Sequence, residues 1–80
     1  MYYVYFIRSL NNPDQTYIGY TENLQDRLNT HNSGNSTHTF KYKPWELLFY
    51  LGFKEKNKAI VFEKYLKSQS GRAFAKKRFL

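Results

Sequence analysis

The chain has 80 residues and a mass of 9.7 kDa, which allows one domain with a small core. Aromatic residues make up 20% of it, a fraction that excludes a disordered chain despite a mean hydropathy of −0.75. The absence of cysteine excludes a disulfide framework, and no apolar run approaches the roughly 18 residues that a membrane-spanning helix needs. We therefore expect a single cytoplasmic domain over residues 1–80, with no membrane partner.

Charge is distributed unevenly between the two halves of the chain. Lys and Arg number 13 against 6 Asp and Glu, for a net charge of +7. Residues 1–40 carry two basic and three acidic side chains, whereas residues 41–80 carry eleven basic and three acidic ones. This one-sided excess favours a polyanionic partner, nucleic acid before a membrane surface, because no stretch pairs a basic face with a continuous apolar one. The alternative is that the lysines only keep an aromatic-rich domain in solution.

The first twenty residues predict a β-hairpin. Residues 2–8 form a β-branched and aromatic run typical of a strand, with odd positions on one face and even positions on the other. Asn11-Asn12-Pro13-Asp14 is a turn signal, because Pro fixes φ and Asn and Asp bond to their own backbone. Residues 16–20 then read as a second short strand.

A helix is expected next. Asn23 is suited to be its N-cap, with Asp26 three residues further on in a capping-box-like arrangement. The helical spacing places four residues on one face, namely Leu24, Arg27, Leu28 and His31. The polar residues 32–36 should end the helix, and the stretch to Lys43 is expected to be a loop.

The second half predicts a strand and two helices. Pro44 opens a strand over residues 45–53 that is apolar on both faces, as a central or doubly covered strand would be. Asn57 should cap a helix that runs to about Ser68, and Gly71 should separate it from a basic helix over residues 72–80. The predicted order is ββαβαα, an α+β domain with a mostly antiparallel three-stranded sheet packed by helices.

Arg27 and His31 are unexpected on the inward face of a helix. Arg is almost never buried unpaired, so this face should line a groove where a guanidinium and an imidazole converge. The planar fork of donors on Arg suits a phosphate. Alternatively, Arg27 pairs with Glu22 or Asp26, and His31 interacts with the C-terminal dipole of the helix.

Glu63 lies in or beside the apolar stripe of its predicted helix. It could form an i,i+4 salt bridge to Lys67, worth only a few tenths of a kcal/mol. It could instead bind Mg²⁺, which takes one or two protein carboxylates and completes its shell with water and phosphate oxygens.

Two tyrosines, Tyr5 and Tyr17, lie on the two strands of the predicted hairpin, and Gly19 follows where another group can approach the backbone. Cross-strand aromatic packing would explain them. A tyrosine hydroxyl can also act as an acid or base, but its usual pKa near 10 requires help from a nearby cation or metal.

The order and spacing of these residues resembles the GIY-YIG endonuclease superfamily, above all its small single-domain members. The resemblance covers nearly the whole chain. It is carried mainly by four segments: Tyr3-Val4-Tyr5, Tyr17-Ile18-Gly19, Arg27-Leu28-x-x-His31-Asn32, and Ala59-x-x-x-Glu63-x-x-x-Lys67. Further matching positions are Thr21, Gly34, Thr39 and Pro44-Trp45-Glu46-Leu47.

The resemblance implies a metal-dependent phosphodiesterase site on one face of the sheet. Tyr5 and Tyr17 fill the positions of the two motif tyrosines, and one of them, or water held by it, would deprotonate the attacking water. Gly19 would keep the approach open.

The helical residues complete the implied site. Arg27 would hold the scissile phosphate and offset charge in the transition state. His31 would polarise the nucleophile or shuttle a proton. Glu63 would coordinate a single Mg²⁺ or Mn²⁺.

The basic second half is expected to bind DNA, although RNA is an open alternative. No element that reads bases is evident, so recognition should depend on backbone or structure. The expected DNA-binding residues are Lys41, Lys43, Lys67, Arg72, Lys76, Lys77 and Arg78. The leading hypothesis is a DNA endonuclease that is a monomer or a weak homodimer. The alternatives are a non-catalytic nucleic-acid-binding module and a protein-interaction module.

Overall fold

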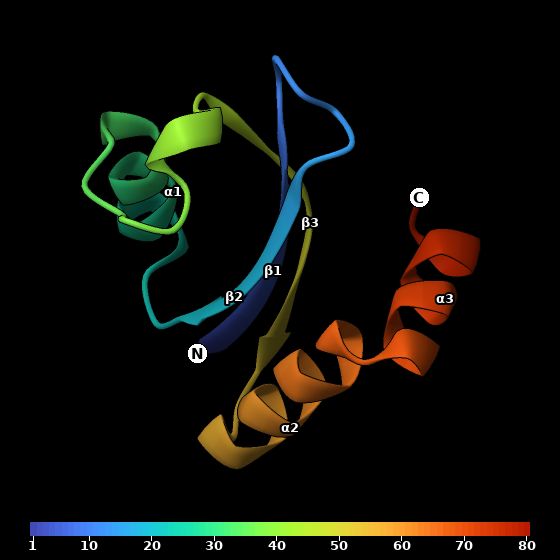
Figure 1. The fold of residues 1–80 in the computed structure, drawn as a ribbon. Coiled ribbons are helices and arrows are strands. Elements are labelled where there is room, and N and C mark those ends of the chain that lie inside the picture. The colour runs from blue at the N-terminus through green and yellow to red at the C-terminus, as the bar shows by residue number, and fades with distance from the viewer.

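A three-stranded antiparallel sheet separates the helices into two layers (Figure 1). The computed structural model describes residues 1–80, and its elements are β1 (Tyr2–Ser9), β2 (Thr16–Thr21), α1 (Leu24–Ser33), β3 (Trp45–Phe53), α2 (Lys56–Lys67) and α3 (Gln69–Arg78). One short 3₁₀ helix, η1 (Phe40–Tyr42), lies in the segment that was expected to be a loop. None of the helices has the length and apolar character needed to cross a bilayer. The predicted α+β class and ββαβαα order are confirmed.

The central strand of the sheet is β1, with β2 and β3 at the two edges. Tyr5 on β1 stands opposite Gly19 of β2 and Tyr50 of β3. The suggestion that the third strand is central is therefore wrong. Its apolar residues are explained by cover on both sides, because Leu47 packs in the cluster next to α1 and Phe49 in the cluster next to α2 and α3.

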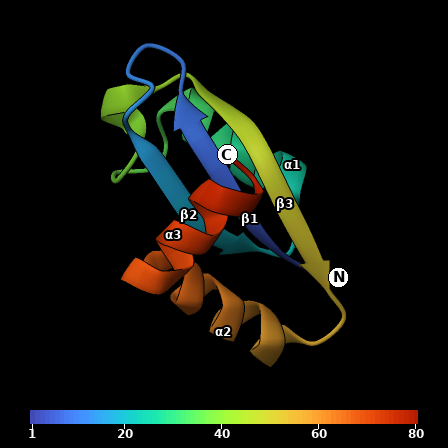
Figure 2. The same ribbon diagram turned by 90° about the vertical axis from the view of Figure 1, so that its right-hand side faces the viewer.

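The two faces of β1 enter two separate clusters, as the alternation in its sequence predicts. Even positions face α2 and α3, which Figure 2 shows in front of the sheet with α1 behind it. Odd positions face α1 and η1. The first cluster consists of Val4, Phe6, Ile18, Ala59, Leu66 and Ala75. The second is smaller and consists of Tyr5, Ile7 and Trp45.

The start of α1 is as predicted. The side chain of Asn23 accepts a hydrogen bond from the backbone N–H of Asp26 at 3.1 Å, which satisfies one of the free donors of the first turn. The helix ends at Gly34, whose φ of 83° is the left-handed C-cap conformation that glycine adopts without strain.

The starts of the last two helices differ from the prediction. The connection after β3 is short, so α2 begins with Glu55 as its N-cap, and Asn57 lies inside the first turn. Gly71 does not separate α2 from α3. The separating residue is Ser68, whose hydroxyl accepts from the backbone N–H of Gly71 at 3.1 Å and so caps α3. Gly71 is buried against the Tyr65 carbonyl, where a side chain would clash.

Candidate active site

Tyr5 is the centre of the candidate site. Only 2% of its surface is exposed, because it lies in the middle of the central strand under α1. Its hydroxyl and ring occupy the position that a Cβ on Gly19, its cross-strand neighbour, would take. Gly19 therefore provides the space in which the Tyr5 ring lies.

A chain of hydrogen bonds joins Tyr5 to two residues that were predicted on one face of α1 and to a residue beyond it. Arg27 Nε donates to the Tyr5 hydroxyl oxygen at 3.3 Å. The same hydroxyl lies 2.8 Å from His31 Nε2, and His31 Nδ1 lies 2.6 Å from Thr39 Oγ1. Because a guanidinium only donates, the Tyr5 oxygen accepts from Arg27 and its own proton is free for His31. We assign the His31 proton to Nδ1, from which it is donated to Thr39.

The surroundings of these groups set their protonation. Burial, followed by the positive charge of Arg27, lowers the pKa of His31 to about 4, so the imidazole is neutral at pH 7. Burial also raises the pKa of Tyr5, and Arg27 offsets part of that rise. The bond from Tyr5 raises the pKa of Arg27, which keeps the guanidinium charged. A neutral imidazole and a fixed cation thus face the same phenol.

The structure does not contain the alternative ion pair of Arg27. His31 lies in the last turn of α1, where the helix dipole acts, but it also has specific side-chain partners. Arg27 forms no ion pair with Glu22 or Asp26, and instead donates a hydrogen bond to Tyr5. His31 is fully buried, and both of its ring nitrogens are hydrogen-bonded.

Tyr17 packs against the same cluster from β2. Its ring centroid lies 6.4 Å from that of Tyr5 and 5.2 Å, in an edge-on arrangement, from that of His31. The second motif tyrosine is thus brought next to the first.

Glu63 approaches from α2 and is joined to none of these groups by a hydrogen bond. Its partner is Lys67, whose Nζ lies 3.3 Å from Glu63 Oε2, so the predicted i,i+4 salt bridge is formed. The carboxylate charge still reaches Tyr5, where it adds to the rise in pKa that burial chiefly causes.

The donor set fits a magnesium site with a single protein carboxylate. No group of three or more His, Cys, Asp or Glu side chains gathers in the structure. Mg²⁺ keeps several of its waters and is commonly bound by one or two carboxylates plus substrate phosphates. The Glu63 side chain is 19% exposed and hydrogen-bonds to no buried group, so it is accessible to an ion, which would have to compete with Lys67.

Sequence reasoning gave no role to two residues that support the site. Thr39 is buried, and besides contacting His31 it accepts the indole N–H of Trp45 on its carbonyl at 2.9 Å. The Asn32 side chain bonds to both the backbone N–H and the carbonyl of Trp45. Asn32 continues the helical face of Leu24 and Leu28, a signal that could have marked it, whereas Thr39 follows the helix in a segment without periodicity and is marked only by the match to the family pattern.

The seven predicted DNA-binding residues are all exposed, but they do not form one surface. Lys41 and Lys43 belong to the segment next to α1, and Lys41 lies 5.5 Å above the ring of Tyr42. The other five, Lys67, Arg72, Lys76, Lys77 and Arg78, lie on α2 and α3, across the sheet (Figure 1).

Several known proteins resemble the chain in sequence. It is 43% identical over 61 residues to a UPF0213 protein of Pediococcus acidilactici, covering 71% of this chain and 62% of that protein. It is 39% identical over 70 residues to a UPF0213 protein of Lactiplantibacillus plantarum, covering 82% and 69%. It is 41% identical over 69 residues to the structure-specific endonuclease subunit SLX1 of Debaryomyces hansenii, covering 78% of this chain but only 20% of SLX1.

The fold and the family pattern agree with these matches. The solution NMR structure of a UPF0213 protein from Bacillus halodurans superposes with a TM-score of 0.58 at 25% identity, covering 99% of this chain and 87% of that one. The family model of the GIY-YIG catalytic domain matches residues 1–78. The chain, with its nuclease-type fold, therefore belongs to the GIY-YIG family.

Proposed function

We propose that the protein is a divalent-metal-dependent endonuclease that hydrolyses phosphodiester bonds in DNA. One observation carries this proposal above the others: a buried, neutral His31 is hydrogen-bonded to a tyrosine hydroxyl that also accepts a bond from Arg27. A proton acceptor and a phosphate-binding cation thus converge on one phenol, an arrangement that packing of the α1 face does not require.

Arg27 is suited to bind the scissile phosphate. Its Nε is engaged by Tyr5, which fixes the side chain and leaves the terminal guanidinium nitrogens free to donate. A fixed cation at this position stabilises the negative charge that builds on the phosphate during attack, without reorganising at that moment.

Tyr5 and His31 would move the proton of the attacking water. Tyr5 alone is a poor base, because its raised pKa makes the tyrosinate scarce at pH 7. A concerted transfer, from water to the Tyr5 oxygen and from Tyr5 to His31 Nε2, avoids a free tyrosinate. Bound phosphate would help, because it neutralises Arg27, whose charge is the second cause of the lowered His31 pKa.

Glu63 would hold the Mg²⁺ or Mn²⁺. When bound, the ion supplies Lewis-acid stabilisation of the phosphate and its leaving oxygen. Lys67, which pairs with Glu63 at 3.3 Å, would compete with the ion for this carboxylate.

Cleavage of labelled branched, flap, single-stranded and duplex DNA, with Mg²⁺ or Mn²⁺ and with EDTA, tests the proposal. We expect metal-dependent cutting that is lost in Glu63→Ala. The matched control is Glu55→Ala, which removes a carboxylate of the same helix from an exposed ion pair with Lys58. This control should cut at the wild-type rate.

Two outcomes would contradict the nuclease. Salt-sensitive DNA binding with no cutting, unchanged by Glu63→Ala, would make the protein a non-catalytic nucleic-acid-binding module. If DNA neither binds nor is cut, a protein-interaction module is the better reading.

A further inference from the structure

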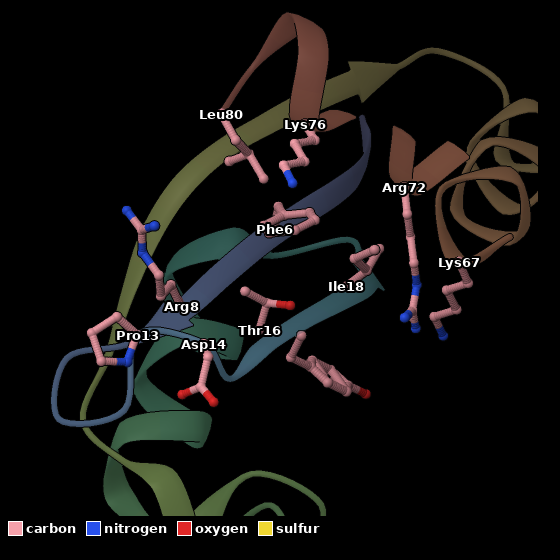
Figure 3. A pocket seen from close by; sticks show the side chains of 11 residues that line it. Phe6, Arg8, Pro13, Asp14, Thr16, Ile18, Lys67, Arg72, Lys76 and Leu80 are labelled. Carbon is pink, nitrogen blue, oxygen red and sulfur yellow. The ribbon is translucent and has the colours of Figure 1, made fainter. Parts of the chain in front are cut away.

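A groove of about 780 Å³ lies between the β1–β2 hairpin and α3, on the face of the sheet turned away from Arg27 and His31. Figure 3 shows Phe6 and Ile18 along its floor, with Arg72 and Lys76 extending from α3 toward the strands. Its volume falls within the roughly 300–1,000 Å³ typical of ligand sites.

The groove combines an apolar floor with cations around its rim. Phe6 and Ile18 lie at the base of the groove and are only 5% and 8% exposed, so the accessible apolar and aromatic surface comes from Leu80, which is 55% exposed, and from the partly exposed Tyr17. The four basic residues that line it are Arg8, Lys67, Arg72 and Lys76, from three different elements. Arg8 and Lys67 already have carboxylate partners, Glu46 at 3.7 Å and Glu63 at 3.3 Å. Arg72 and Lys76 have none, so they are the cations available to a ligand.

This chemistry fits one strand of nucleic acid. Single-stranded sites place a positive groove along the backbone and give the bases a flat apolar or aromatic surface. A concave site of this size admits a single strand, whereas a duplex would contact only its rim. Asp14, the one carboxylate of the lining, repels phosphate but can accept from the amino group of a base. The backbone should therefore lie toward α3 and the bases toward the hairpin turn.

The groove shares residues with the surroundings of the candidate active site at the edge strand β2. Tyr17 lines the groove, and its ring packs against Tyr5 and His31. Lys67 lines it too, and is paired with Glu63. A nucleic-acid strand that leaves the groove on this side would pass Tyr17, a residue of the candidate site, and Lys67, the partner of Glu63.

We propose that this groove binds unpaired nucleotides of the strand that is cut, an inference that rests on the proposed nuclease function. The substrate then carries a single-stranded segment directly beside the cleaved bond.

The test compares two double variants of equal charge. Arg72→Ala/Lys76→Ala removes the free cations of the groove, and Lys54→Ala/Lys56→Ala removes two exposed lysines at the turn before and the start of α2. All four side chains are exposed, so both variants should fold, which far-UV circular dichroism checks. The probes are a fluorescein-labelled 12-nucleotide single strand and a blunt duplex of that sequence, titrated at several salt concentrations.

We expect the groove variant to bind the single strand at least tenfold more weakly than the control variant does. Its slope of log affinity against log salt should be shallower than that of the wild type by about 1.4, since each phosphate contact on a single strand contributes roughly 0.7. Metal-dependent cleavage of a substrate with a single-stranded arm should fall by a similar factor, and blunt-duplex binding should change equally in both variants.

Failures of the inference and of the proposed function are distinguishable. If the wild type cleaves DNA but the two variants weaken single-strand binding equally, the groove assignment is overturned and the nuclease stands. If the groove variant loses duplex affinity as strongly as single-strand affinity, the groove is a general phosphate surface and the inference is again overturned. If the wild type neither binds nor cuts any probe, both proposals fall.

Discussion

The two faces of the sheet have different chemistry although the same strand supplies both. On the α2 and α3 face, Val4 and Phe6 enter an apolar cluster with Leu66 and Ala75, and none of the buried polar side chains of the protein comes from α2 or α3. On the α1 face, Tyr5 and Ile7 lie beside His31, which is buried yet hydrogen-bonded at both ring nitrogens. No buried side-chain nitrogen or oxygen lacks a partner. The comparison indicates that one face of the sheet is held by apolar burial alone, while the other includes a buried polar network that is tolerated because every member is hydrogen-bonded.

The largest expected effect is a loss of stability when the apolar face is truncated. Leu66→Ala truncates a fully buried residue and should lower the free energy of unfolding by about 2–5 kcal/mol. Leu66 belongs to the cluster on the opposite face from Tyr5 and takes no part in the hydrogen bonds of Tyr5, Arg27 and His31, so cleavage per folded molecule should be unchanged. Urea denaturation and single-turnover cleavage, corrected for the folded fraction, measure the two quantities. A variant that stays folded but loses cleavage would show that the faces are not separable.

The converse change is made at Arg27 on the polar face. Arg27→Met keeps the apolar stem but removes the charge and the bond to Tyr5, and should reduce the cleavage rate about 10²–10³-fold, the range seen for loss of one transition-state donor. Arg27 is only half-buried, so the urea midpoint should move little. A change in stability as large as that of Leu66→Ala would make Arg27 a structural residue instead.

Acid should destabilise the polar face through His31. The pKa of His31 is about 4 in the folded chain and near 6.5 in the unfolded one, so between these values the unfolded chain binds more protons. Stability therefore falls as pH drops from about 6.5 to 4, by up to roughly 3 kcal/mol. Of the groups that face His31, only Arg27 is charged, and its positive charge further lowers the pKa of His31. The other two, Tyr5 and Thr39, are neutral hydrogen-bond partners.

Comparing His31→Gln with the wild type separates the contribution of His31 to acid destabilisation from that of the carboxyl groups, which bind protons in an overlapping pH range. Urea midpoints at pH 7 and pH 4.5 should differ less in the variant than in the wild type. An equal drop in both proteins would contradict the buried neutral imidazole.

The smallest effect concerns the Glu63–Lys67 pair at the border between the two faces. Lys67→Met removes an exposed i,i+4 ion pair, so the free energy of unfolding should change by only a few tenths of a kcal/mol. It also removes the competing cation from Glu63, so Mn²⁺ should bind at a lower concentration, as measured by electron paramagnetic resonance without DNA. Weaker Mn²⁺ binding in the variant would speak against Glu63 as the ligand.

Much of this arrangement follows from the order of residues. The alternation in β1 predicts which side chains face each layer, and Asn23 with Asp26 predicts the start of α1, because both signals are local. The spacing of Arg27 and His31 places them on one side of α1. Their convergence on Tyr5 follows from the family resemblance, since nothing local joins a strand residue to a helix 22 residues later.

Other features depend on tertiary contacts that no local pattern records. Thr39 meets His31 because Trp45 and Asn32 fix the intervening segment. The groove forms only when α3 folds back over the hairpin, so the place of Arg8 in it is not readable from its neighbours in sequence. The predicted boundary between the last two helices was wrong at Gly71, because a glycine that ends a helix cannot be distinguished in sequence from one that allows two helices to pack closely.

The ring of Tyr5 above Gly19 also bears on how relatives diverge. A single methyl group at position 19 would displace the tyrosine hydroxyl while leaving the apolar cluster, the basic helices and the groove in place. Under the proposed function, loss of this glycine would abolish cleavage while leaving a protein of the same shape that still binds. Homologues with a larger residue at this position are where a family member that retains nucleic acid without cutting it should be sought.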